Sequence, residues 1–229
     1  MEIKVLRNIL EANEAIAREN ARLFKDKGVF VINIMSSPGA GKTSFILRTL
    51  ERLKDDFKVA VIEGDIASKV DAEKIQEQGA PAVQINTGGA CHLDANMIKN
   101  ALNLLNLDDI DLLIIENVGN LVCPAEFNLG EDLKLMILST PEGDDKPLKY
   151  PQMFTLCSVL VLNKIDLLNQ TNFNLRKVRE SAAKLNANLQ IFEVSCTTGR
   201  GIDNWVTWLK NKLLLGRLQT HRGSVGGRE

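Results

Sequence analysis

Short apolar runs alternate along the chain with segments of helical periodicity. The runs cover residues 29–35, 58–64, 81–86, 111–117, 156–163 and 189–195. They are nearly continuous in apolar residues, as in DLLIIEN at 111–117, and this is typical of strands buried on both faces of a parallel sheet. The segments between them have the spacing of helices. We therefore predict an α/β fold in which a mostly parallel sheet is flanked by helices on both faces.

The two ends of the chain differ from this pattern. Apolar residues recur at helical spacing in the first 27 residues, among Lys, Glu, Arg and Asn: Leu6, Ile9, Leu10, Ile16, Ala17, Leu23 and Phe24. We predict an amphipathic helix over residues 1–27, packed on a domain that spans residues 28–215. The polar, glycine-rich end HRGSVGGRE predicts a disordered tail over residues 216–229.

Composition narrows the class of protein. The chain has 229 residues, 45% hydrophobic and 25% charged, as expected for a soluble globular protein. Lys plus Arg (28) nearly balance Asp plus Glu (29), so neither nucleic acid nor an anionic membrane is favoured as a partner. Neither a signal peptide nor an apolar run long enough to span a bilayer is present, which predicts a cytoplasmic location. The four widely spaced cysteines then favour metal binding or catalysis over disulfides.

The segment SSPGAGKTS at 36–44 follows the first predicted strand and precedes a helical pattern, as a phosphate-binding loop requires. Lys42 would place a cation between the β- and γ-phosphates, and the Thr43 hydroxyl would ligate Mg²⁺. Ser36 stands where the usual pattern has glycine, and a chance glycine-rich turn is disfavoured by the strand and helix on either side. The residues predicted to surround the phosphates are Pro38, Gly39, Ala40, Gly41, Lys42, Thr43 and Ser44. They indicate a P-loop NTPase.

The segment NKID at 163–166 indicates which base is bound. The Asp166 carboxylate can accept hydrogen bonds from N1–H and the 2-amino group of guanine, which adenine lacks. Asn163 and Lys164 would hold the loops and flank the ring. In SCTTG at 195–199, small residues follow the last predicted strand and can offer backbone amides to guanine O6: Ser195, Cys196 and Thr197. The predicted nucleotides are GTP and GDP.

Two acids at strand ends complete the predicted magnesium site. Asp65 and Glu116 would join Thr43 around Mg²⁺, with Asp65 nearer and Glu116 acting through water. Glu116 and Gly119 form E-x-x-G where GTPases commonly have D-x-x-G. Asp71 is a looser candidate for the magnesium site and is equally well explained as a solvated helix charge. No glutamine is placed to orient water, so we expect slow GTP hydrolysis. The predicted catalytic residues are Lys42, Thr43, Asp65, Glu116 and Gly119.

Three soft ligands follow two of the predicted strands. Cys91 and His92 are adjacent after the 81–86 run, and Cys123 follows the 111–117 run. Because the carboxyl ends of parallel strands meet at one edge of a sheet, these side chains can converge on a metal ion. Three ligands leave one position open, which suits a transferable ion better than a structural zinc. Ni²⁺ and Zn²⁺ both remain candidates.

Several motifs in order resemble the HypB family of hydrogenase-maturation GTPases over nearly all of residues 30–215. They are SSPGAGKT, EGDIASKVDAE, TGGACHLDANMI, ENVGNLVCPAEFNLGEDLK, EGDDKPLKYP, LNKIDLL and SCTTGRG. The resemblance implies nickel delivery to [NiFe]-hydrogenase, and a homodimer in the GTP state with Cys91, His92 and Cys123 binding nickel or zinc near the subunit interface. It also implies the nickel protein HypA as a partner and the hydrogenase large subunit as an indirect one. MEIKVLRNIL lacks the cysteine motif and the histidine-rich stretch of some members, which argues against nickel storage.

Other functions fit the sequence less well. The urease-maturation GTPase carries a Cys-Pro-His motif, which has no match here. A GTPase fold with a passive structural zinc and a vestigial nucleotide site is disfavoured by the intact Lys42, Thr43 and Asp166, and a P-loop kinase is disfavoured by the guanine motif. Cys123 lies four residues after Gly119, where a GTPase loop meets the γ-phosphate, so nucleotide state can change the metal geometry.

Overall fold

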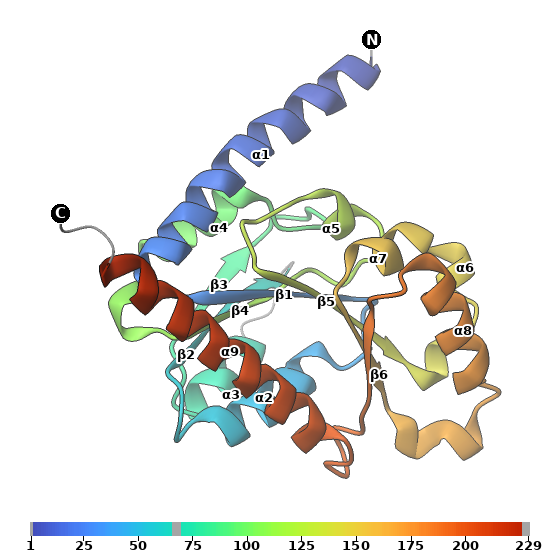
Figure 1. Cartoon of the computed structure of the whole chain (residues 1–229). Coiled ribbons are helices and arrows are strands. Elements are labelled where there is room, and N and C mark those ends of the chain that lie inside the picture. The colour runs from blue at the N-terminus through green and yellow to red at the C-terminus, as the bar shows by residue number, and fades with distance from the viewer. Residues whose placement is uncertain (1, 66–69, 226–229) are drawn as a thin grey trace.

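The computed structural model describes residues 2–65 and 70–225, and the side chains of residues 7–65 and 72–217. Seven parallel strands form one sheet in the order β3-β2-β4-β1-β5-β6-β7 (Figure 1). The strands are β1 Phe30–Ser36, β2 Val59–Asp65, β3 Ala82–Asn86, β4 Leu112–Glu116, β5 Leu133–Ser139, β6 Val159–Asn163 and β7 Gln190–Glu193. The predicted α/β fold with a parallel sheet is therefore confirmed.

Helices connect the strands and cover both faces of the sheet. They are α1 Glu2–Lys27, α2 Lys42–Leu53, α3 Val70–Glu77, α4 Ala95–Leu102, α5 Cys123–Glu126, α6 Lys146–Lys149, α7 Pro151–Leu156, α8 Leu175–Leu185 and α9 Ile202–Val225. Short 3-10 turns are η1 Leu107–Asp109, η2 Thr140–Glu142 and η3 Ile165–Gln170. None of the described helices combines the length and apolar content needed to cross a bilayer.

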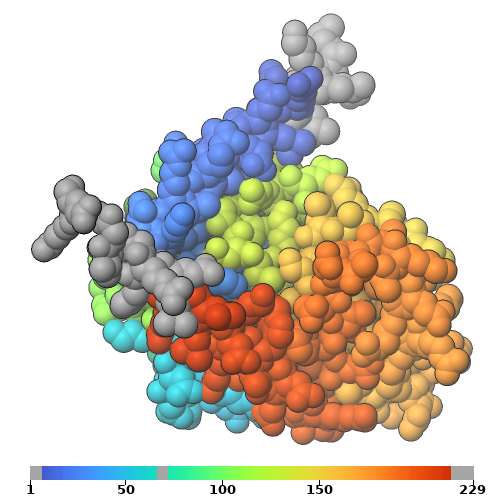
Figure 2. Space-filling view, viewed as in Figure 1, coloured from blue at the N-terminus to red at the C-terminus, as the bar shows by residue number. Residues whose placement is uncertain are grey.

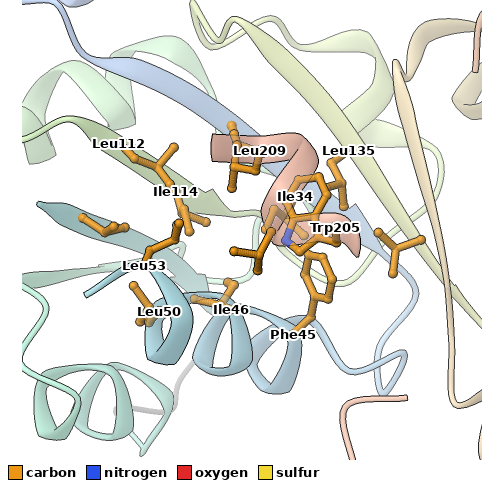
Figure 3. Close-up of a cluster of buried hydrophobic side chains, with 14 of the residues drawn as sticks. Ile34, Phe45, Ile46, Leu50, Leu53, Leu112, Ile114, Leu135, Trp205 and Leu209 are labelled. Atoms are coloured by element: carbon orange, nitrogen blue, oxygen red, sulfur yellow. The ribbon is translucent and has the colours of Figure 1, made fainter. Parts of the chain in front are cut away.

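One face of the sheet packs against α2, α3 and α9. Figure 3 shows Trp205 of α9 packed between the sheet and α2. The centroids of the Trp205 and Phe45 rings are 5.3 Å apart. Its indole Nε1 donates a 3.0 Å hydrogen bond to Oγ1 of Thr49, which satisfies the buried polar atom. On the other face, α1 and α4 cover one half of the sheet and α5, α7 and α8 cover the other half.

Helix α1 packs on the domain from Asn13 onward. Ala17 and Phe24 are buried, whereas Ile9 is 50% exposed. The N-terminal half stands away from the body of the molecule (Figures 1 and 2). The sequence predicted an amphipathic helix over residues 1–27 packed on the domain, and the part of α1 from Asn13 onward makes such contacts.

Two elements differ from the sequence prediction. Strand β5 was missed, although its LKLMILS run is interrupted only by Lys134 before the final serine. Helix α9 continues to Val225, whereas we expected disorder from residue 216. Arg217 gives a physical reason, because its guanidinium pairs with Asp111 and lies 4.7 Å from the ring of Phe57. Residues 226–229 lie outside the described part of the chain.

Candidate nucleotide and metal site

Most of the residues predicted for the phosphates and Mg²⁺ lie around one cleft of about 550 Å³ at the carboxyl edge of the sheet. The predicted residues that line this cleft are Pro38, Gly39, Gly41, Lys42, Thr43, Ser44, Asp65, Glu116, Gly119 and Lys164. Glu63, Gly64 and Asn117 line it as well and were not predicted. A ligand here would lie over the amino end of α2, where backbone N–H groups favour phosphate.

The loop between β1 and α2 is held by residues of the NKID segment. Gly41 has φ +98°, and a Cβ at this position would lie 2.5 Å from Nδ2 of Asn163, so glycine is required. Nδ2 of Asn163 donates to the carbonyl of Ala40 at 3.0 Å, and Nζ of Lys164 donates to the carbonyl of Gly39 at 2.7 Å. The base motif therefore fixes the shape of the phosphate loop directly.

Oxygen ligands suited to Mg²⁺ lie beside this loop. The Thr43 hydroxyl donates to Oε1 of Glu116 at 3.0 Å, and Glu116 is only 5% exposed. Asp65 ends β2 on the same side of the cleft. A hydroxyl and two carboxylates are the hard donors that Mg²⁺ prefers, so these residues fit the ion. Nζ of Lys42 donates to Oγ of Ser36 at 3.2 Å, at the phosphate side.

The sequence analysis did not predict a second buried carboxylate, that of Glu63. Glu63 of β2 is in register with Glu116 of β4 and is 3% exposed. The sequence feature that could have indicated Glu63 is its position before Gly64 and Asp65 in an otherwise apolar strand, since a buried acid at a strand end often belongs to a functional site. The side chain of Asp71, the looser magnesium candidate, lies outside the described residues.

The residues predicted to bind the base lie at or after the ends of β6 and β7, and of these only Lys164 lines the cleft. Asp166 is exposed and lies in η3, which begins directly after Lys164. Lys164 has a φ of 60°, and the chain turns at this residue. The Cys196 amide donates to Oδ1 of Asn163 at 3.4 Å, and the buried Ser195 accepts from the Thr198 amide through Oγ at 3.1 Å. Burial raises the pKa of the Cys196 thiol to about 11, so it remains protonated at neutral pH. Thr197 lies beside Cys196 in a hollow that Ser44, Arg48 and Glu51 of α2 also line.

The three predicted soft ligands converge. One donor atom each of Cys91, His92 and Cys123 can be chosen so that all lie within 4.8 Å of one another. The two thiol sulfurs are 3.0 Å apart, and Sγ of Cys91 is 3.7 Å from Nδ1 of His92. Cys91 is exposed and the other two are half-buried, so a metal ion here would be open to solvent. The third ligand begins α5 rather than lying in a loop.

Neighbouring residues set the orientation of the His92 ring and shift the pKa values of His92 and Cys123. The His92 ring stacks on Phe127 with centroids 3.8 Å apart. Burial lowers the pKa of His92, which favours the neutral imidazole that metals bind. The hydrogen bond with Cys91, followed by burial, raises the pKa of the Cys123 thiol, so this proton must be displaced when a metal binds. Cys157 is a buried packing residue whose burial raises its pKa to about 12.

Asn117 joins the two sites. This fully buried residue follows Glu116, and its Oδ1 accepts hydrogen bonds from the amides of Leu93 at 3.1 Å and Val118 at 2.9 Å. Leu93 follows the predicted metal ligand His92, whereas Val118 leads into the loop of Gly119. A Cβ on Gly119 would lie 2.9 Å from Pro38 of the phosphate loop, so that loop packs directly on the nucleotide site.

Comparison with known proteins agrees with this geometry. Residues 30–193 match the CobW/HypB/UreG nucleotide-binding domain. The chain is 48% identical to the hydrogenase maturation factor HypB of Escherichia coli (strain K12), over 90% of this chain and 71% of that protein. It is 39% identical to the probable HypB of Methanocaldococcus jannaschii, over 92% and 96% of the two chains. The crystal structure of Helicobacter pylori HypB in complex with nickel matches with a TM-score of 0.84 and 42% identity, over 88% of this chain and 95% of that chain. The chain therefore belongs to the HypB family of hydrogenase maturation factors.

Proposed function

We propose that the protein hydrolyses GTP and uses its nucleotide state to bind and release nickel for insertion into [NiFe]-hydrogenase. The observation that carries the proposal is the bridge made by Asn117, which hydrogen-bonds both to the residue after His92 and to the residue before Gly119. Membership of the HypB family and the nickel-bound relative from Helicobacter pylori support the same conclusion.

The nucleotide part of the function rests on charge and hydrogen bonding. Lys42 and the amides of the phosphate loop would hold the β- and γ-phosphates, and Asp166 would select guanine. Thr43, Asp65 and Glu116 would hold Mg²⁺, which neutralises charge that develops on the phosphates during transfer. The described residues include no glutamine on the rim of the cleft, and this supports the expectation of slow turnover.

The metal part rests on two thiols and one imidazole. These three groups bind Ni²⁺ and Zn²⁺ alike, so we propose nickel as the cargo on the strength of the family. Three protein ligands leave at least one coordination position for a group from a partner. Cys91 is exposed and Val122, beside Cys123, is 51% exposed, so a second protein can reach the ion.

We further propose that two chains dimerise around this exposed site when GTP is bound. An isologous contact would bring two sets of Cys91, His92 and Cys123 close to a two-fold axis. Hydrolysis would release the loop of Gly119, move the linked Leu93 and Cys123, and loosen both metal and dimer. A HypA-type nickel protein would exchange the ion with this site, and the hydrogenase large subunit would receive it indirectly.

Two measurements on the purified full chain test the proposal. Phosphate release should be slow, specific for GTP over ATP, and dependent on Mg²⁺. Equilibrium dialysis should find nickel bound by the wild type and strongly weakened in Cys123→Ala, whereas the control Cys157→Ala, which removes a buried packing thiol, should keep nickel affinity. Absence of GTP turnover, or undiminished nickel binding by Cys123→Ala, would refute the proposal.

A further inference from the structure

Two asparagines of α1 contact both segments that carry the metal ligands. The first segment carries Cys91 and His92 and leads into Ala95, the first residue of α4, three residues after His92. The second contains Asn128 and Leu129, directly after Phe127, which stacks on the His92 ring. These segments are far from α1 in sequence, yet α1 lies along α4 in Figure 1.

Each asparagine makes one hydrogen bond to each segment. Oδ1 of Asn13 accepts from the Ala95 amide at 2.8 Å, and its Nδ2 donates to the carbonyl of Asn128 at 2.8 Å. Nδ2 of Asn20 donates to the carbonyl of Ala95 at 2.9 Å and to the carbonyl of Leu129 at 3.1 Å. Asn13 and Asn20 are 7% and 2% exposed, so water does not substitute for these bonds.

The spacing and packing of α1 support a specific role for Asn13 and Asn20 in holding the two segments together. Residues 13 and 20 are seven apart and therefore lie on the same face of the helix. Between them, the fully buried Ala17 allows close contact, and a Cβ on Gly130 would lie 2.6 Å from the Ala17 carbonyl. Hydrophobic packing alone would not need two buried amides, since a buried polar group is costly unless every hydrogen bond is made.

We infer that Asn13 and Asn20 are positioning residues for the metal site, which hold the Cys91–His92 segment and the Cys123–Phe127 segment at the separation that a metal ion requires. Groups that orient metal ligands without touching the ion set affinity by restricting the ligand geometry. The part of α1 from Asn13 to Asn20 thereby belongs to the metal site, although none of its side chains is among the three soft ligands. This inference rests on the proposed nickel function.

The test compares nickel affinity of the wild type, Asn20→Ala and Asn13→Asp, measured through sulfur-to-nickel charge-transfer absorption. Asn20→Ala removes both bonds and should weaken nickel binding at least about tenfold. Asn13→Asp keeps an acceptor for the Ala95 amide but sets a buried carboxylate against the carbonyl of Asn128, so it should also weaken nickel binding. Asn8→Ala, at an exposed asparagine of the same helix, is the matched control and should leave affinity unchanged.

Two further readouts separate this role from general support of the fold. The unfolding temperature and the GTP affinity are measured for each variant. Wild-type nickel affinity in Asn20→Ala, together with a lowered unfolding temperature, would show a merely structural role and overturn the inference. If the wild type binds no nickel, the proposed function is refuted, and the inference that rests on it is refuted with it. If the wild type binds nickel and Cys123→Ala does not, the proposed function stands, and the nickel affinities of the asparagine variants alone decide the inference.

Discussion

Replacing Gly64 by alanine is expected to disturb the metal segment from within the nucleotide cleft. A Cβ at Gly64 would lie 2.7, 2.8 and 2.8 Å from Cγ, Cδ1 and Cδ2 of Leu93, well inside van der Waals contact. Leu93 is fully buried, so in a close-packed core it can move aside only by displacing its neighbours. Overpacking of this kind costs about 1–3 kcal/mol, so Gly64→Ala should destabilise the fold by that amount. It should also weaken nickel binding, because Leu93 directly follows His92.

A double-mutant cycle makes this prediction specific. Leu93→Ala alone should cost about 2–5 kcal/mol, because it leaves a cavity in the core. In the double variant the new methyl group at residue 64 occupies part of that cavity, so the two costs should not add, and the coupling should be about 0.5–3 kcal/mol. Urea unfolding followed by circular dichroism, without metal or nucleotide, measures all three variants.

Gly216→Ala is the matched control. Gly216 lies within α9, and nothing would lie within 4 Å of its Cβ. This substitution should stabilise the helix by up to about 1 kcal/mol, the opposite sign to Gly64→Ala. Strictly additive costs for Gly64→Ala and Leu93→Ala would mean that Gly64 and Leu93 are not in the proposed contact, and the reasoning would fail.

Three further predictions concern the base, the phosphates and stability. Asp166→Asn should weaken GTP binding and shift preference toward xanthosine nucleotides, since the amide can donate to the 2-carbonyl of xanthine; unchanged GTP affinity in competition assays would contradict the assignment of the base pocket. Lys42→Ala should abolish GTP turnover while the circular dichroism spectrum stays that of the wild type, and retained turnover would contradict the phosphate-loop assignment. Burial raises the pKa of Asp132, so this carboxyl contributes stability below its unfolded pKa that is lost as pH rises through the folded pKa. Asp132→Asn, which can still accept from the Val31 amide, should therefore melt higher than the wild type at pH 7, with the difference shrinking toward pH 4; an equal or lower melting temperature at pH 7 would disprove it.

The sequence predicted those parts of the fold that depend on local pattern. Six of the strands were visible as apolar runs, and the phosphate loop was visible because its glycines, Lys42 and Thr43 occur at fixed spacing between a strand and a helix. The convergence of Cys91, His92 and Cys123 followed from the rule that parallel strands end at one edge. Strand β5 was missed because Lys134 interrupts its apolar run one residue after the strand begins.

Other features depend on tertiary contacts and have no local signature. Asn13 and Asn20 read as polar positions of an amphipathic helix, and only the folded chain brings them to the backbone of Ala95. Asn117 likewise resembles an ordinary residue at a strand end until its partners are known. The helix beyond residue 216 is polar in sequence, but Arg217 contacts two residues that are distant in the chain, the acidic Asp111 and the aromatic Phe57.

The central claim is that the nucleotide cleft and the metal site are coupled through the segment from Glu116 to Cys123 and its bridge to Leu93. The most direct test is the nickel affinity of the wild-type protein with GDP and with a non-hydrolysable GTP analogue, with the oligomeric state recorded in each case. We predict that the two affinities differ by about 1–3 kcal/mol, and that nickel changes the relative affinity for the two nucleotides by the same factor. Equal nickel affinities and equal oligomeric states with both nucleotides would contradict the coupling.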